Sequence, residues 1–133
     1  MSQENVEVVR QTIEAWNQHD LDSGLRFLAP DIEWAPASPA AVERSLYRGH
    51  EEVIRGFDAI WDTWDEFRFE ESEVRDLGDS VLWLGTVHMR ASTSGIELTQ
   101  EFANHLVLRA GKIVMARAFM SWQEAFEAVG LSE

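Results

Sequence analysis

The sequence predicts an α+β fold, in which a curved, mostly antiparallel sheet wraps around N-terminal helices and forms a cone-shaped barrel with an internal pocket. Apolar residues recur at helical spacing in the first half of the chain, and from about residue 66 they alternate at the period of strands. Helices followed by antiparallel strands are typical of domains whose helices cover one face of a sheet. The 133 residues, 45% of them apolar, can bury one core, so we expect residues 1–133 to form a single domain.

The N-terminal part of the chain predicts two helices and the start of a strand. Residues 3–18 predict an amphipathic helix, because four apolar residues recur at helical spacing: Val6, Val9, Ile13 and Trp16. Asp20 can cap a short second helix that Pro30 ends. The apolar residues of this second helix are Leu21, Leu25 and Leu28. Ile32 and Trp34 then begin an extended segment.

The middle of the chain predicts a loop and a third helix. The stretch APASPAAVERSLYRG is too rich in Ala, Ser and Pro for regular structure, so residues 36–48 predict a loop or flap over the pocket. Residues 50–65 predict a helix, with Glu51 and Glu52 at the positive end of its dipole. One face of this helix carries its apolar residues, which are Val53, Ile54, Phe57, Ile60, Trp61 and Trp64.

Three antiparallel strands follow, and they cover residues 66–77, 80–91 and 96–108. In the first of them Phe67 and Phe69 alternate with charged residues, whereas Val74 is out of phase with them, which predicts a bulge. Gly78-Asp79 and Ser94-Gly95 provide the turns between the strands. A final helix carries Trp122, Phe126 and Val129 and ends at Gly130.

The LRAGK segment predicts the last hairpin, with a three-residue loop in which Gly111 is left-handed and Leu108 pairs with Lys112. This register decides which residues share a face of the sheet. The inner face is apolar apart from two amides, and it consists of Leu98, Gln100, Phe102, Asn104, Leu106, Val114, Ala116, Ala118 and Met120. The outer face is mixed, and it consists of Glu97, Glu101, His105, Met115, Arg117 and Phe119.

A mixed outer face is typically half exposed or contacts another subunit, so we expect a homodimer that forms through this face. A register slip of one residue would turn three outer residues inward, because successive side chains of a strand alternate between faces. His105, Glu101 and Arg117 would then form an acid–base cluster in the pocket. The sequence leaves this alternative open.

The composition excludes several classes of function. The chain has no cysteine, which excludes disulfides, thiolate zinc sites and cysteine nucleophiles. A net charge of -13 disfavours nucleic acids and anionic membranes as partners, because binding to them rests on Lys and Arg. The four histidines lack metal-ligand spacing, so we expect no metal site, and no motif indicates a cofactor. The chain has no signal-like leader and no apolar run that could span a membrane, so we expect a cytoplasmic protein.

An interior lined by aromatic side chains suits a hydrophobic small molecule. The candidate ligand-binding residues are Trp16, Trp34, Tyr47, Phe57, Trp61, Trp83, Phe102, Asn104 and Met120. Asn104 stands out because an amide in an apolar face needs hydrogen-bond partners, which a ligand, Gln100 or a helix can provide. Tyr47 either reaches into the mouth of the pocket or packs the loop. The aromatic residues have core packing as the alternative to ligand contact.

The order of these parts resembles the SnoaL-like polyketide cyclases, within the superfamily of ketosteroid isomerase and nuclear transport factor 2. The resemblance runs over nearly the whole chain and rests on AWNQHDLDSGLRFLAPDIEW, YRGHEEVIRGF, SGIELTQEFANHLVLRAGKIV and EAFEAVGL. No single segment is specific, but together they imply the cone-shaped α+β fold. The superfamily includes isomerases, cyclases, hydrolases and proteins that only bind, so the resemblance leaves the activity open.

The resemblance implies that the isomerase's catalytic residues are missing here. Its catalytic aspartate precedes a proline on the first strand, where this chain has Ala35 before Pro36. Its protonated aspartate corresponds to Asn104, which can donate a hydrogen bond but cannot exchange a proton. Its oxyanion tyrosine falls near Thr12. The cyclases use acids or histidines on the inner sheet face, and the inner face of the last two strands has neither.

Two functions therefore remain. The leading one is a SnoaL-like protein that binds a hydrophobic small molecule in its cavity, and that acts as a cofactor-independent isomerase, cyclase or hydrolase if it is an enzyme. The alternative is a non-catalytic ligand-binding module or a dimeric interaction module, which the alanine at position 35 favours.

Overall fold

The computed structural model describes residues 2–37 and 46–131 of the chain. The helices are α1 (Ser2–Asn17), α2 (Leu21–Leu25), α3 (Gly49–Thr63) and α4 (Trp122–Val129). The strands are β1 (Leu28–Ala35), β2 (Tyr47–Arg48), β3 (Trp64–Asp76), β4 (Ser80–Ala91), β5 (Glu97–Arg109) and β6 (Lys112–Phe119). None of the helices in the described ranges is long and apolar enough to cross a membrane.

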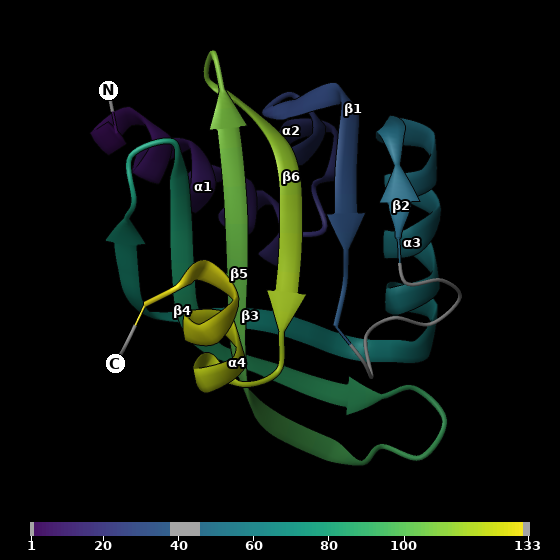
Figure 1. Cartoon of the computed structure of the whole chain (residues 1–133). Helices are drawn as coiled ribbons and strands as arrows, with labels where there is room; N and C mark the ends of the chain where they lie inside the picture. Colours follow the sequence, from purple (N-terminus) through teal and green to yellow (C-terminus); the bar gives the residue numbers. More distant parts are fainter. Residues whose placement is uncertain (1, 38–45, 132–133) are drawn as a thin grey trace.

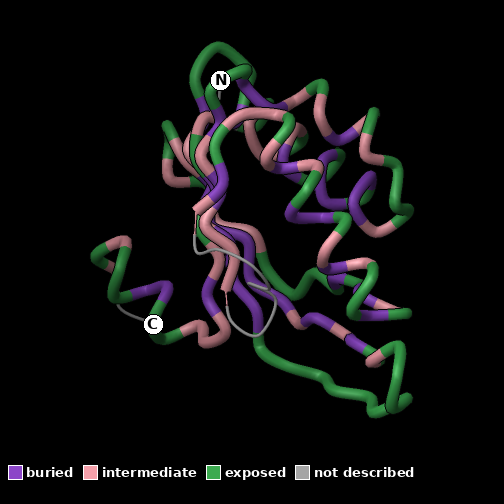
Figure 2. The backbone as a smooth tube through the Cα atoms, turned by 90° about the vertical axis from the view of Figure 1, so that its right-hand side faces the viewer, coloured by how far each residue is buried: buried purple, intermediate pink, exposed green. Residues whose placement is uncertain are grey.

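One six-stranded sheet, in the order β2-β1-β6-β5-β4-β3, forms the wall of the fold. All neighbouring strands are antiparallel except β1 and β6, which are parallel. The sheet is curved but does not close on itself, and α1 and α3 lie on its concave side, against β1, β3 and β4 (Figures 1 and 2). This arrangement confirms the predicted α+β class, as an open cone rather than a closed barrel.

The second predicted helix is shorter than expected. Asp20 caps α2 as predicted, since the backbone N–H of Ser23 donates to its carboxylate at 3.3 Å. The side chain of Ser23 first, and then this backbone bond, hold the pKa of the Asp20 carboxyl below its usual range. Leu28, however, lies in β1 and not in the helix, and Pro30 lies within that strand. A register shift between Leu28 and Glu33 leaves the stretch around Pro30 out of the regular ladder, so its missing N–H costs no ladder hydrogen bond.

The predicted bulge in β3 is present. The register of β3 against β4 shifts between Glu71 and Glu73, and again near the start of the strand. Gly85 of β4 faces the first of these shifts and makes it possible, because a Cβ atom at Gly85 would lie 2.0 Å from the carbonyl oxygen of Glu70. The glycine thus lets the two backbones approach closely.

The last hairpin differs from its prediction, yet most side chains keep their faces. Arg109 pairs with Lys112 across a two-residue turn, Ala110-Gly111, in which both residues are left-handed, with φ of 54° and 77°. A register shift between Val107 and Leu108 moves the pairing by one more residue, and this restores the predicted alternation of inward and outward side chains. As a result Asn104 pairs with Ala118 and stays on the inner face. The one changed position is at the irregularity, where Ile113 is buried in the core and Val114 is only half-buried.

The C-terminal helix covers part of the outer face, which we expected to be half exposed or in contact with a subunit. In Figure 2 α4 lies on the side of the sheet opposite α1 and α3. A second apolar cluster lies beneath it and consists of Leu82, Leu84, Ala103, Phe119, Ala125 and Phe126. Phe119 is therefore buried, whereas Met115 remains 39% exposed on the uncovered part of the same face.

Candidate functional site

A small cavity lies inside the cone, between α1, α3 and the concave face of the sheet. Its lining consists of Trp16, Trp34, Pro36, Ala37, Phe57, Ile60, Phe67, Phe69, Phe102, Asn104 and Ala118. Its volume is about 20 Å³. A single water needs roughly 10–15 Å³ of such space, so the cavity holds about one water and no aromatic ring in this conformation.

Stacked and tilted aromatic rings fill most of the interior. The rings of Trp34 and Phe57 stack with centroids 4.6 Å apart and planes 8° apart, and Trp16 lies 5.2 Å from Phe57. The absence of a side chain at Gly56 brings α3 this close to β1, because a Cβ atom there would lie 2.5 Å from the Trp34 ring. The packing of these rings therefore determines how much of the interior is open to a ligand.

Asn104 provides the amide of the cavity, and the indole Nε1 atom of Trp16, another lining residue, is likewise buried without a partner among the described residues. The side chain of Asn104 is 2% exposed, and its Oδ1 atom has no hydrogen-bond partner among the described residues. Gln100, which the sequence offered as a partner, is exposed and makes no such bond. A buried acceptor without a partner costs about 1–3 kcal/mol, so a donor that enters the cavity would remove a real penalty.

No titratable side chain lines the cavity in the described part of the chain. His105, Glu101 and Arg117 do not turn inward: His105 pairs with Leu82 and Arg117 on the outer face, so the register slip is excluded. The carboxylate of Glu101 instead accepts a hydrogen bond from the backbone N–H of Trp122 at 2.9 Å. The described lining therefore offers neither a general acid nor a general base.

The buried Thr12 has no free hydroxyl either. Its Oγ1 donates to the carbonyl of Val8 at 2.8 Å within α1. Ala35, at the end of β1, has no polar side chain, so neither of these two positions supplies a general acid or base. No group of three or more His, Asp or Glu within residues 2–37 and 46–131 is arranged to hold a metal ion.

The structure brings together five of the predicted ligand-binding residues and separates four. Those in the lining are Trp16, Trp34, Phe57, Phe102 and Asn104. Tyr47 is buried behind Trp34, with ring centroids 5.2 Å apart, and Trp61 stacks on His19 at 4.3 Å. Trp83 is buried beside Phe69, and Met120 lines a hollow outside the cavity. The question whether the 36–48 segment closes the cavity concerns mainly residues 38–45, which lie outside the described residues.

Sequence reasoning missed part of the lining. Phe67 and Phe69 carried a usable signal, since they alternate in a predicted strand, but the bulge obscured the face on which that strand presents them. Ile60 lay on the predicted apolar face of α3 beside larger aromatic residues. Pro36 and Ala37 carried no signal, because a loop has no period from which a facing direction follows.

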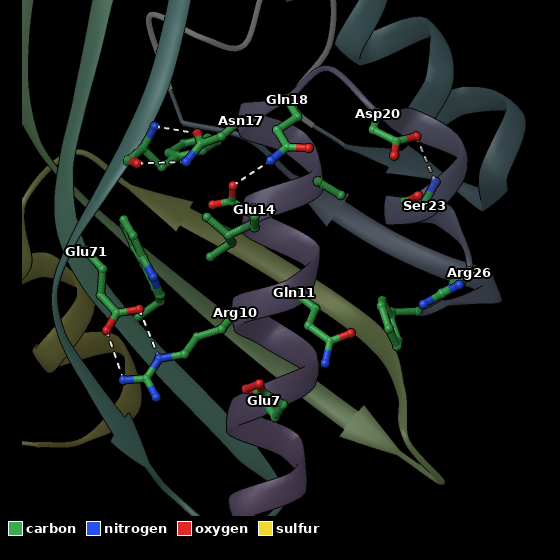
Figure 3. Close-up of a pocket in the computed structure, with 15 residues that line it drawn as sticks. Glu7, Arg10, Gln11, Glu14, Asn17, Gln18, Asp20, Ser23, Arg26 and Glu71 are labelled. Atoms are coloured by element: carbon green, nitrogen blue, oxygen red, sulfur yellow. Dashed lines mark hydrogen bonds and ion pairs between the residues drawn. The ribbon is translucent and has the colours of Figure 1, made fainter.

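A second and larger hollow, of about 600 Å³, runs along the exposed side of α1 (Figure 3). Its polar groups are largely engaged with one another. Arg10 forms two hydrogen bonds with Glu71 at 2.9 and 3.1 Å, and Gln18 donates to Glu14 at 2.7 Å. The Asn17 amide bonds both the N–H and the carbonyl of Phe69. We therefore favour the smaller interior cavity as the site, because, of these two hollows, only its lining includes buried polar atoms without a partner, on Trp16 and Asn104.

Comparison with known families agrees with this architecture. The family model of the SnoaL-like domain matches residues 9–116. The chain belongs to the SnoaL-like domain family. No curated protein matches the chain significantly.

Solved structures share the fold of this SnoaL-like domain. An NTF2-like protein of unknown function from Burkholderia pseudomallei is 25% identical, with a TM-score of 0.81, and the match covers 93% of this chain and 95% of that one. TerC, co-crystallised with polyporic acid, is 19% identical with a TM-score of 0.80, over 96% and 98% of the two chains. A protein with a ketosteroid isomerase-like fold from Catenulispora acidiphila, in complex with trimethylamine, is 15% identical with a TM-score of 0.76, over 95% and 94%.

Proposed function

We propose that this SnoaL-like domain binds a small, planar, hydrophobic molecule in its interior cavity, with Asn104 as the polar contact. One observation carries the proposal: the buried Oδ1 atom of Asn104 has no partner, and it faces an otherwise aromatic interior. Because the free atom is an acceptor, the ligand that fits it carries a hydroxyl or N–H donor. The cavity of about 20 Å³ is too small for a ring, so binding requires the aromatic side chains around Phe57 to move.

Binding without catalysis is the form of this function that the lining favours. A cofactor-independent isomerase, cyclase or hydrolase moves protons, and such a step needs a titratable group within hydrogen-bond reach. The described lining contains none. An enzyme is the second candidate, supported by the SnoaL-like family and by the ability of the Asn104 amide to bind a substrate hydroxyl or carbonyl. TerC, a chain of the same fold, was co-crystallised with polyporic acid, which supports a small-molecule site in this fold.

The donor requirement gives a direct test with two matched ligands, 4-ethylphenol and 4-ethylanisole. They differ in that the phenol donates a hydrogen bond and the methyl ether does not. We expect the phenol to bind about 10-fold more tightly, which corresponds to about 1.4 kcal/mol, a typical value for one hydrogen bond. Thermal shift and isothermal titration calorimetry measure the difference.

The variant Asn104→Leu is the matched control, because leucine has nearly the same shape without the polar atoms. We expect the variant to bind both compounds with equal affinity and to melt no lower than the parent, since it removes an unpaired buried acceptor. The proposal would be contradicted if neither compound stabilised the parent at millimolar concentration. A large loss of stability in Asn104→Leu would show that Asn104 has a structural partner instead.

We also propose that the uncovered part of the outer sheet face, around Met115 and Val107, is a homodimer interface. Met115 is 39% exposed, and Val107 pairs with it across the two strands. An exposed methionine beside a valine is an apolar centre of the kind that subunit interfaces bury. Native mass spectrometry at micromolar concentration should give a dimer mass for the parent and a monomer mass for Met115→Glu. A monomer of the parent chain would refute the interface.

A further inference from the structure

A surface hollow of about 550 Å³ lies directly outside the interior cavity. Its lining consists of Ala35, Pro36, Ala37, Arg117, Ala118, Phe119, Met120 and Glu124. Pro36, Ala37 and Ala118 line both the hollow and the cavity. The two spaces are therefore separated by a wall that is one residue thick, and two of the three residues in this wall are alanines.

The strand pairing explains why the wall is thin here. The last pair between β1 and β6 is Ala35 with Arg117, whereas β6 continues to Phe119. Figure 1 shows β6 extending past the end of β1. Beyond this pair the described residues of β1 form no further pair with β6, so the sheet pairing ends next to Ala118. This alanine is the cross-strand partner of Asn104, the polar residue of the cavity.

Arg117 supplies the positive charge in the lining of this hollow. Its guanidinium lies 5.0 Å over the ring of Phe119, which restricts its position. No described carboxylate lies within 4.0 Å of it, including that of Glu124, the acidic side chain in the same lining. The charge also acts on its neighbour: burial first, and then Arg117, lower the pKa of His105. A guanidinium without an ion pair is well suited to bind a carboxylate through two hydrogen bonds.

Building on the proposed function, we propose that this hollow is the entrance to the cavity and that Arg117 binds a carboxylate on the ligand. The ligand class is then a hydroxylated aromatic acid. Its ring enters past Ala118 and its hydroxyl donates to Asn104, while its carboxylate stays in the hollow on Arg117. A local cation is needed for such a ligand, because a protein of net charge -13 repels anions over most of its surface.

The test compares 4-hydroxyphenylacetate with 4-hydroxyphenylacetamide, which has the same ring and donor but no charge. We expect calorimetry to show that the parent binds the acid about 10-fold more tightly than the amide at low salt. Arg117→Gln should abolish this preference and leave the affinity for the amide unchanged. Arg109→Gln is the matched control, because Arg109 is an exposed arginine next to the β5–β6 turn, outside the lining of the hollow, and it should retain the preference.

A second readout uses His105, the neighbour of Arg117. In an NMR titration, the bound acid should raise the pKa of the His105 imidazole by neutralising the field of Arg117, and the amide should not. If Arg117→Gln folds poorly, Arg117→Lys keeps the charge and should keep a reduced preference for the acid. Equal binding of acid and amide by the parent would overturn the role of Arg117 and leave the cavity function standing. Binding of neither compound would overturn both proposals.

Discussion

Replacement of Gly85 by alanine is expected to destabilise the protein by about 3 kcal/mol or more, the upper range for overpacking in a core. The added Cβ atom would lie 2.0 Å from the carbonyl oxygen of Glu70 and 2.6 Å from the ring of Trp83. A backbone carbonyl cannot rotate away as a flexible side chain can, so β3 and β4 must separate at the bulge. The carbonyl of Gly85 also accepts a hydrogen bond from the Trp122 indole at 3.0 Å, so the same shift loosens α4. Urea denaturation measures the loss.

Gly111→Ala separates this steric effect from conformational strain. Gly111 has a φ of 77°, but a Cβ atom there would meet nothing within 4 Å. Its replacement should cost only about 1 kcal/mol, the usual penalty of a left-handed alanine. A loss at Gly85 no larger than the loss at Gly111 would contradict the close approach of the two strands.

Replacement of Phe57 by alanine should produce the second large effect, a loss of about 3–5 kcal/mol in the free energy of unfolding. Phe57 is 2% exposed and touches Trp34, Trp16 and Trp61, with ring centroids 4.6, 5.2 and 5.3 Å away. The deletion joins the space of one ring to the existing cavity of about 20 Å³. Apolar cavities of ring size stay dry and bind benzene.

Benzene should therefore restore part of the lost stability of the variant, as a rise in melting temperature that depends on benzene concentration. The parent protein is the control, since a ring enters its cavity of about 20 Å³ only after the rings around Phe57 move, so benzene should stabilise the parent much less than the variant. A variant that gains no more from benzene than the parent would show that the interior collapses around the deletion. It would also show that the rings around Phe57 do not define the ligand space.

The secondary structure could be predicted well wherever local periodicity determines it. The predicted strand over 80–91 coincides with β4, and the predicted helix over 3–18 differs from α1 by a single residue at each end. Even the bulge in β3 was visible, as a change of phase after Phe69. These features depend on which side chains of one segment must face the same core, and the order of residues records that directly.

The last hairpin shows why a register is harder to predict. The length of the loop was wrong, but the two-residue turn and the irregularity at Val107 together moved the pairing by two residues. A shift by an even number preserves the face of every side chain beyond it. Asn104 therefore reached the interior as predicted, although its partner is Ala118. The predicted face of each of these side chains was therefore correct, although the predicted cross-strand pairs were wrong by two residues.

The sequence by itself determined the α+β class, the elements and a buried amide on an aromatic face, because each depends on periodicity and polarity along the chain. Only the tertiary structure decided that α4 covers part of the outer face and that Phe67 and Phe69 share the cavity with Asn104. It also decided that the cavity holds no more than a water, and that β1 ends where Ala118 and Arg117 flank the wall. The volume of the cavity and the thickness of the wall beside it depend on segments that are distant in the sequence and meet in the fold, and no local pattern specifies how closely these segments pack.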